Sequence, residues 1–161
     1  KRAVDMLLKK VAGEEFKSEY IQEIPEKVPV APYIKDLTKA TIALLTTGGM
    51  VPAGNPDHIE GSAATKFGVY SMEGLPALEK GKIVSIHGGY DTSYAYENPN
   101  RIVPLDIMRE LEDNGIIGKV HEFFYSTAGT GASLINGEAF GRAIADMLQK
   151  AGVDAALMVS T

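Results

Sequence analysis

Residues 83–104, IVSIHGGYDTSYAYENPNRIVP, contain the transition on which the predicted fold depends. An apolar run at 83–86 is followed at once by His87 and two glycines, which permit a tight turn or a close backbone approach. This pattern predicts a strand that ends in a polar loop. Open α/β sheets usually place their binding sites just past the carboxyl ends of strands, so the loop is a candidate site. A solvated surface loop with exposed tyrosines explains the same residues about equally well.

On either side of this stretch, strand-like and helix-like patterns alternate with short turns. We expect strands at 40–46, 83–87, 119–126 and 154–161, and helices at 2–12, after Pro104 and around 140–151. Pro52 and Pro56 argue against regular structure after the first strand, and Asp57 could cap a short helix starting near His58. The alternation favours parallel strands joined by right-handed helical crossovers. The predicted fold class is a three-layer α/β fold with a mostly parallel open sheet, of Rossmann-like or flavodoxin-like topology.

The chain divides by composition into an appendage and one core domain. Residues 1–39 combine the N-terminal helix with a proline-containing extended arm, in which Pro25, Pro29 and Pro32 are interleaved with charged residues. Residues 40–161 form the α/β domain. Because the chain stops directly after an apolar run, we expect this domain to be truncated after its fourth predicted strand.

The overall composition excludes several classes of function. The 161 residues carry a formal net charge of -5, so the basic patch typical of nucleic-acid binders is not expected. No apolar run approaches the ~20 residues that cross a bilayer, and no signal-peptide pattern opens the chain, which favours the cytoplasm. The absence of cysteine excludes disulfides and a cysteine nucleophile. The three histidines have no i, i+4 spacing, so no metal site is expected.

Polar and glycine-rich segments follow each predicted strand, and parallel strands would bring them to one edge of the sheet. The Gly48-Gly49 turn and the Thr127 to Gly131 loop could present backbone amides to an anion, although ordinary tight turns also explain them. His87 is a candidate general base with Asp91 as its orienting carboxylate, although Asp91 could equally be a structural cap. Arg101 could clamp a carboxylate or simply tie its own loop together. Hydroxyl groups that could donate hydrogen bonds at this edge come from Ser126, Thr127, Ser160 and Thr161.

Taken in order, four segments resemble a known family. They are GGMVPAGNPDHIE, HGGYDTSYAYENPNRIVPLD, GKVHEFFYSTAGTG and GVDAALMVST. Together they resemble the large selenoprotein B subunit of the glycine, sarcosine and betaine reductases, over roughly residues 39–161. In that family the last strand runs into a selenocysteine. The resemblance therefore implies a selenocysteine immediately after Thr161 in the full-length protein, and a fragment without its nucleophile here.

The resemblance also implies a reaction and its partners. A pyruvoyl group on a partner subunit activates the amine of a small amino-acid substrate, and a selenolate then attacks the carbon that bears the nitrogen. The carboxymethyl group passes to a small selenoprotein carrier, protein A, while thiols supply the electrons. This is nucleophilic catalysis, which divides a difficult C–N cleavage into separate steps. The present chain, lacking the nucleophile, is expected to be inactive on its own.

Residue by residue, the resemblance points to the loops already singled out. As a hypothesis, His87 or Tyr90 manages protons near the selenium, with Asp91 beside them. Arg101 and the loop amides would hold the substrate carboxylate. The expected substrate-binding residues are Gly48, Gly49, Gly88, Gly89, Arg101, Ser126, Thr127, Gly129 and Thr130, and Ser160 and Thr161 adjoin the missing nucleophile.

Two other interpretations remain open. The D-proline reductase selenoprotein shares the HGGYD stretch, although the GNPD and ENPNRIVP segments look more like the glycine-type subunit. A non-catalytic α/β binding or assembly module would also explain a cysteine-free chain without an obvious base and nucleophile pair. A selenocysteine codon directly after Thr161 would separate the enzyme from the module.

Overall fold

The computed structural model describes residues 1–18 and 27–161, which fall into two compact units. The first unit, residues 1–30, contains helix α1 (Arg2–Ala12), and Gly13 ends it in the left-handed conformation with φ 70°. Both features agree with the sequence prediction. The helix residues Val4, Leu7, Leu8 and Val11 are exposed to solvent. Pro25 of the predicted arm lies outside the described residues, and the predicted boundary at residues 39 and 40 stays a prediction.

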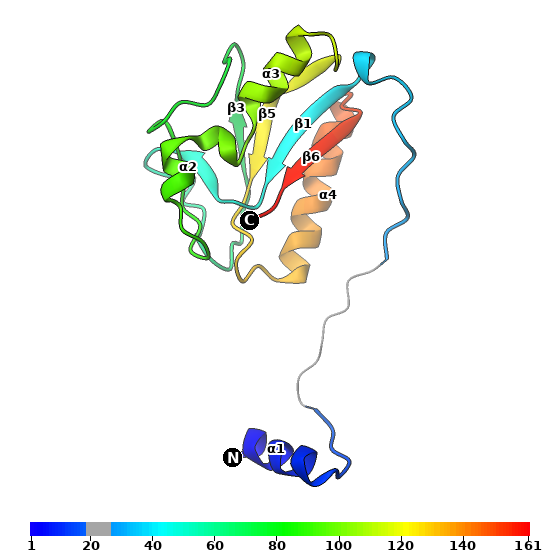
Figure 1. Ribbon diagram of the computed structural model, residues 1–161, viewed down its shortest axis with the longest axis vertical. Helices are drawn as coiled ribbons and strands as arrows, with labels where there is room; N and C mark the ends of the chain where they lie inside the picture. The colour runs from blue at the N-terminus through cyan, green and yellow to red at the C-terminus, as the bar shows by residue number, and fades with distance from the viewer. Residues whose placement is uncertain (19–26) are drawn as a thin grey trace. The chain divides into compact units, whose positions relative to one another are not determined.

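The second unit, residues 31–161, is built on a four-stranded sheet with the order β3-β5-β1-β6 (Figure 1). Strands β1 (Thr41–Thr46), β5 (Lys119–Ser126) and β6 (Ala155–Val159) are parallel, and β3 (Gly68–Ser71) pairs antiparallel with β5. Thr46 is level with Ser126 on one side and with Val159 on the other, so the three parallel strands end at the same edge.

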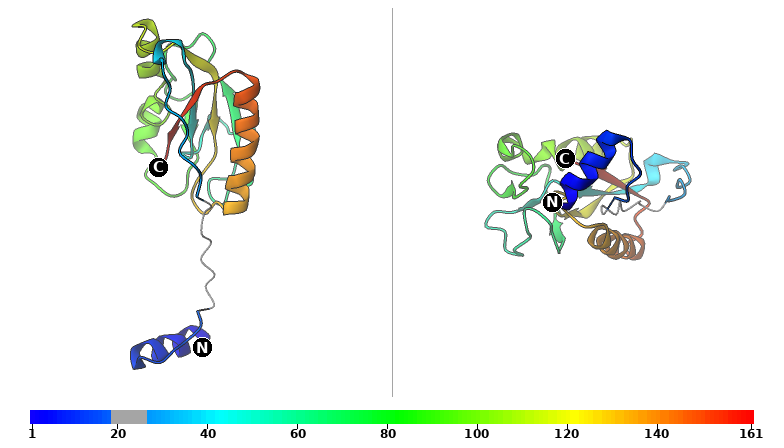
Figure 2. Two further views of the ribbon diagram at one scale, coloured as in Figure 1. Left: turned by 90° about the vertical axis from the view of Figure 1, so that its right-hand side faces the viewer. Right: turned by 90° about the horizontal axis from the view of Figure 1, so that it is seen from below.

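Helices cover both faces of this sheet. Helix α4 (Leu134–Lys150) lies on one face, whereas α2 (Ser93–Glu97) and α3 (Leu105–Asp113) lie on the other (Figure 2). Single 3-10 turns at Leu37–Lys39 and Pro99–Arg101 complete the regular structure. The three-layer, mostly parallel α/β fold predicted from the sequence is therefore confirmed.

The position of the strand at residues 83–87 differs from the prediction. Strand β4 (Ile83–Ser85) does not join the main sheet and instead pairs antiparallel with β2 (Met50–Pro52) in a separate two-stranded sheet. Regular structure at Pro52 was not expected, but a proline is tolerated in so short a strand with a free edge. The sequence pattern correctly identified a strand here. Its pairing partner, β2, is visible only in the tertiary structure.

The short helix expected from His58 does not form. Asn55 and His58 both adopt positive φ values, 47° and 50°, which a right-handed helix does not allow. The Asn55 side chain also bonds the backbone of Ile59 in both directions, accepting from its N–H at 3.0 Å and donating to its carbonyl at 2.9 Å. This bond pair closes a compact turn in place of the helix. Asp57 therefore has no helix to cap.

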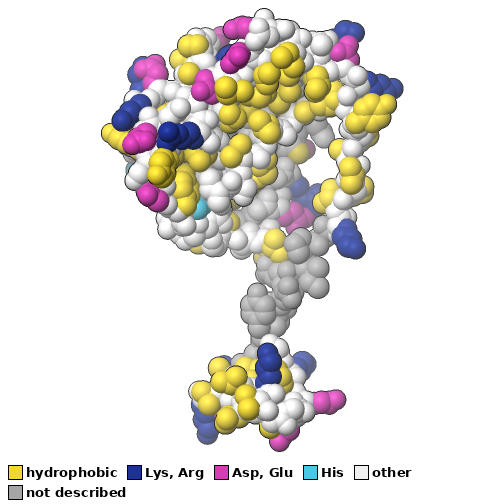
Figure 3. Space-filling view, in the orientation of Figure 1, with side chains coloured by type: hydrophobic (Ala, Val, Ile, Leu, Met, Phe, Trp, Pro, Cys, Tyr) yellow, Lys and Arg dark blue, Asp and Glu magenta, His cyan; other side chains and the backbone are white. Residues whose placement is uncertain are grey.

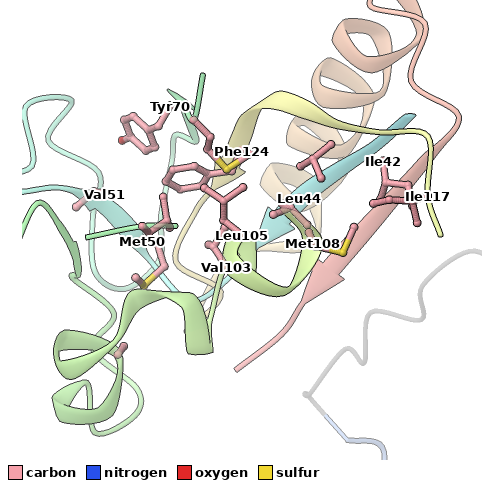
Figure 4. Packing of buried hydrophobic residues seen from close by; sticks show 14 of the residues in the cluster. Ile42, Leu44, Met50, Val51, Tyr70, Val103, Leu105, Met108, Ile117 and Phe124 are labelled. Atoms are coloured by element: carbon pink, nitrogen blue, oxygen red, sulfur yellow. The ribbon is translucent and has the colours of Figure 1, made fainter. Parts of the chain in front are cut away.

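The main core lies between the sheet and the α3 side of the domain (Figure 4). Leu44 and Phe124 point into it from neighbouring strands, and Leu105 and Met108 close it from α3. Alternate residues of the same strands face α4, where Ala43 and Tyr125 pack with Ile144 and Leu148. Each fully buried side chain of this size contributes about 1.5–3 kcal/mol to folding, so β1, apolar on both faces, is held from both sides.

Candidate functional site

Turns from separate parts of the chain are joined at the carboxyl edge of the main sheet. Gly49 N–H donates to the carbonyl of Thr127, and Gly129 N–H donates to the carbonyl of Thr47, both at 2.9 Å. The loop after β4 joins them, because Ile86 N–H donates to the carbonyl of Gly49 at 2.9 Å. The predicted loops thus lie together, although the loop at residues 86–91 reaches this edge from the small antiparallel sheet.

His87 is buried at the centre of this cluster, and both of its ring nitrogens have partners. Nδ1 accepts a hydrogen bond from Gly89 N–H at 3.0 Å, and Nε2 lies 3.0 Å from the hydroxyl oxygen of Thr130. The backbone N–H of Thr130 also donates to Nε2 at 3.3 Å, so N–H donors face both ring nitrogens. This arrangement suits a neutral ring, because an imidazolium would have no lone pair to accept either bond. Burial also lowers the pKa of His87, because desolvation disfavours the imidazolium.

Tyr90 closes the side of the cluster next to His87. Its ring centroid lies 4.8 Å from the imidazole centroid, and its hydroxyl lies 2.9 Å from Ser85 Oγ and 3.1 Å from the carbonyl oxygen of Gly48. Ser85 Oγ in turn donates to the same Gly48 carbonyl at 2.8 Å. Ser85 was not among the predicted site residues; the only signal for it in the sequence was a hydroxyl residue within an otherwise apolar run.

Asp91 and Arg101 lie outside this group of contacts. The Asp91 carboxylate accepts from the backbone N–H and the hydroxyl of Ser93, at 3.0 and 2.6 Å, and these bonds lower its pKa. Nη1 of Arg101 lies 3.3 Å from the Tyr94 carbonyl and 3.5 Å from Glu97 Oε2, with the guanidinium over the Tyr94 ring. Asp91 therefore acts as a local turn residue, and the imidazole is held by Gly89 and Thr130 instead.

The backbone amides predicted to bind substrate already have partners in this fold. Gly48 donates to Thr46 Oγ1 at 2.9 Å, and Gly88 donates to the carbonyl of Gly61 at 2.8 Å. The N–H groups of Gly49, Gly89 and Gly129 make the bonds described above. A substrate carboxylate would have to share or displace these donors, so in the present geometry the glycines serve chiefly to connect the loops.

The segment at residues 61–63 also belongs to the cluster, which the sequence analysis did not foresee. Besides the bond from Gly88, Ala63 N–H donates to the Thr130 carbonyl at 2.7 Å. A Cβ on Gly61 would collide with the carbonyl oxygen of Ile86, so a residue without a side chain is needed there. The run of small residues around Gly61 was the available signal.

The end of β6 reaches the same cluster. The Val159 carbonyl accepts from Thr47 N–H at 3.2 Å and from the Thr46 hydroxyl at 3.0 Å. Beyond it, the methyl group of Thr161 lies 3.2 Å from the position that a Cβ on Gly48 would occupy. Thr161 therefore lies beside the Gly48-Gly49 turn that contacts His87, with Ser160 directly before it in the chain.

Two neighbouring hydroxyl residues end β5. Ser126 is buried, and its Oγ has no hydrogen-bond partner among the described residues. Thr127 Oγ1 donates to the carbonyl of Lys66 at 2.8 Å. Thr127 thus ties the turn to the segment before β3, whereas Ser126 retains an unused hydroxyl.

Residues of this edge line two cavities. One, of about 320 Å³, lies between α4 and the sheet, where Ser126, Thr127 and Gly129 meet the helix residues Gly141 and Phe140. The other, of about 460 Å³, is lined by Ser85 together with Lys80, Thr92, Ser93, Tyr96 and Glu97. The first is mainly apolar, and the second carries both a cation and a carboxylate.

Across residues 1–18 and 27–161, no helix is both long enough and apolar enough to span a membrane. Within that same part of the chain, no three histidine, aspartate or glutamate side chains are grouped as a metal site would require.

Comparison with known proteins places the chain in a family. The sequence profile described as "Glycine/sarcosine/betaine reductase selenoprotein B" matches residues 1–161. The chain is 50% identical over its whole length to "Glycine reductase complex component B subunit gamma" of Carboxydothermus hydrogenoformans. Over 99% of its length it is 49% identical to "Betaine reductase complex component B subunit beta" and 44% identical to "Sarcosine reductase complex component B subunit beta", both of Peptoclostridium acidaminophilum.

The chain spans 37% of the length of each of these relatives. No solved structure matches it. The profile covers the whole chain, and relatives named for all three substrates match at 44–50% identity. The chain therefore belongs to the glycine/sarcosine/betaine reductase selenoprotein B family, in agreement with the resemblance seen in its sequence.

Proposed function

We propose that this chain is part of the B component of a reductase that cleaves the C–N bond of glycine, sarcosine or betaine. Its family and the names of its relatives support this assignment. The relatives named for the three substrates are similarly close in identity, so the proposal covers the substrate class as a whole. Thiols would supply the electrons for the reductive step.

The observation that carries the proposal is the position of Thr161 beside the Gly48-Gly49 turn. A residue directly after Thr161 would emerge at the edge where His87, Tyr90 and Thr130 meet. We place the family's selenocysteine there in the full-length protein, where a selenolate would supply the nucleophile. Two hydroxyl groups, those of Ser160 and Thr161, would immediately precede it.

The residues of this chain would then position the substrate and move protons. Neutral His87 can accept a proton only by giving up its bond from Gly89 N–H or its bond from Thr130 N–H, whereas the Tyr90 hydroxyl lies within hydrogen-bond distance of two oxygens. Tyr90 is the simpler proton donor of the two. Arg101 would hold the carboxylate through Nε and Nη2, which have no partner among the described residues, while the five loop glycines shape the site.

The assembled enzyme would require further components. The relatives are named as components of complexes, which fits a pyruvoyl-containing partner subunit that binds the substrate amine and a small selenoprotein carrier that accepts the carboxymethyl group. No residue of the present chain is assigned to either contact.

Reading the gene past the Thr161 codon is the first test, because a TGA triplet followed by an open frame is expected. The second test uses the full-length, selenium-containing protein with its partner components and measures amine or ammonia release from the three substrates. Serine in place of the selenocysteine should abolish release from the preferred substrate. An ordinary stop codon, or turnover that survives the serine replacement, would remove the selenolate from the proposal and favour a non-catalytic module.

A further inference from the structure

Strand β6 forms one border of the main sheet, and its outer edge is unpaired within residues 1–18 and 27–161. Its inner edge bonds to β1, since the Val159 carbonyl accepts from Thr47 N–H. In a parallel ladder alternate residues bond to the same neighbour, so Ala156 and Met158 direct their backbone N–H and C=O groups outward. An edge of this kind is a template for another strand.

Both faces of β6 are apolar and exposed. Met158 is 60% exposed and Leu157 is 41% exposed, and these neighbours point to opposite sides of the sheet. Met158 and Ala156 line the cavity of about 320 Å³ beneath α4. On the other face, hydrophobic side chains gather beside α3 over the neighbouring strands (Figure 3). The strand AALMV carries no charge or proline, the usual protection of a free edge.

We propose that this edge receives a β-strand parallel to β6, together with a helix that packs beside α4. Both elements would be supplied by the part of the full-length protein outside these 161 residues. The relatives provide the necessary length, because the chain spans only 37% of theirs. The added strand completes the backbone bonds of Ala156 and Met158, and the added helix covers their side chains.

The handedness of the connections selects the face that the helix covers. The connection from β5 to β6 passes outward across β1, with α4 on one face of the sheet (Figure 2). Right-handed crossovers that continue in one direction place their helices on one face. A helix between β6 and a strand beyond it therefore lies on the α4 side. There it closes the mouth of the cavity, where Met158 is exposed.

Residue-resolved hydrogen exchange on the 161-residue chain and on the full-length protein tests the strand. The outward amides of Ala156 and Met158 should exchange at least about tenfold more slowly in the full-length protein. The inward amides of Leu157 and Val159 serve as internal controls, because their bonds to β1 exist in both forms. Equal exchange of the outward amides in the two proteins would overturn the proposal.

The same measurement distinguishes a second copy of the chain from the proposed occupant. Edge-to-edge pairing of two 161-residue chains would protect the outward amides in a concentration-dependent way, with a dimer in sedimentation analysis. That result would also overturn the proposal.

A charged substitution tests the helix. Met158→Asp should change the unfolding rate of the 161-residue chain less than about twofold, because the side chain is exposed there. In the full-length protein the same carboxylate would be buried beneath the added helix, so the unfolding rate should rise at least about tenfold. Ile135→Asp, on α4 outside the cavity, is the matched control and should be nearly silent in the shorter chain. Equal small effects of Met158→Asp in both proteins would exclude a covering helix.

Discussion

The imidazole Nε2 of His87 lies 3.0 Å from the hydroxyl oxygen of Thr130, although the two residues are 43 positions apart in the sequence. This contact joins the loop after β4 to the loop after β5. Because Nδ1 is occupied by Gly89 N–H, the ring is held on both sides. Its orientation is therefore set by the fold before any substrate or partner arrives.

Removal of the Thr130 hydroxyl should destabilise the chain. Thr130→Val keeps the shape of the side chain but removes the hydroxyl that lies 3.0 Å from Nε2 of buried His87, at a cost of about 0.5–1.5 kcal/mol. Thr130→Ser keeps the hydroxyl and is the control, with a smaller expected loss. Urea unfolding of the three proteins measures the difference. Equal stability of the valine and serine variants would show that this hydrogen bond contributes nothing.

Stability should fall as the pH is lowered through the ordinary range of histidine. The folded state lowers the pKa of His87, so between its folded pKa and the unfolded value of about 6.5 the unfolded chain binds more protons. The contribution of His87 to the free energy of unfolding is therefore complete above pH ~6.5 and decreases as the pH falls below that value. Protonation would also remove the lone pair that accepts from Gly89.

The contribution of His87 to this pH dependence must be separated from that of His121, whose pKa burial also lowers. His87→Gln should flatten the stability profile below pH ~6.5 relative to the unsubstituted chain, and His121→Gln should leave the His87 part in place. Proton NMR of the imidazole gives the pKa directly. A titration midpoint of His87 at or above the unfolded value would contradict the prediction.

An alanine at Gly49 should be poorly tolerated. Gly49 has φ 66°, and a Cβ there would lie 2.9 Å from the backbone nitrogen of His87. The left-handed conformation alone costs an ordinary residue about 1–2 kcal/mol, and the contact adds to it. Gly137→Ala is the matched control, because a Cβ has open space there within helix α4, and it should stabilise by up to about 1 kcal/mol. Thermal unfolding should rank the two variants on opposite sides of the unsubstituted chain.

Tyr90 and Ser85 should be energetically coupled. Tyr90→Phe removes the hydroxyl shared by Ser85 and Gly48, and Ser85→Ala removes the group that lies between them. Each change alone should cost about 0.5–1.5 kcal/mol. The double variant should cost less than the sum by at least ~0.5 kcal/mol, measured as a double-mutant cycle in urea. Simple additivity would mean that the short distances carry no interaction energy.

Steady-state kinetics can test whether Arg101 binds the substrate. If its guanidinium holds the substrate carboxylate, Arg101→Ala in the full-length, selenium-containing protein should raise KM about tenfold or more with a smaller effect on kcat. Arg101→Lys should recover only part of the loss, because the planar fork is absent. Unchanged kinetics in Arg101→Ala would limit Arg101 to its contacts with Tyr94 and Glu97.

The sequence predicted a helix or strand well where apolar spacing and an adjacent turn residue specify it within a few positions. Helix α1 and strand β5 have the predicted bounds, because apolar periodicity and a following glycine or polar turn depend on nearby residues alone. Helix α4 begins earlier than its apolar pattern, at a Ser133 side chain that accepts from Asn136 N–H. Patterns of the same kind failed at His58, where the Asn55 side chain closed a turn instead.

In the candidate site, too, features specified by neighbouring residues were predicted, and contacts between distant residues were not. Glycine pairs after apolar runs located the loops, and the resemblance to a reductase family named the same loops. The partners within the site were not predictable, because Ser85, Gly61 and Thr130 reach the cluster through contacts distant in sequence. The pairing of His87 with Asp91 was suggested by proximity in the chain, but Asp91 bonds to Ser93 instead.

The sequence by itself determined the fold class, the positions of the three parallel strands and of helices α1 and α3, and the family. These follow from short-range periodicity, turn chemistry and ordered motifs, which need no knowledge of distant contacts. Only the tertiary structure decided that β4 pairs with β2, that the loop amides are already bonded, and that β6 lies at an open edge. Strand pairing and hydrogen-bond partners depend on which distant segments meet, and a three-residue strand carries too little pattern to specify its neighbour.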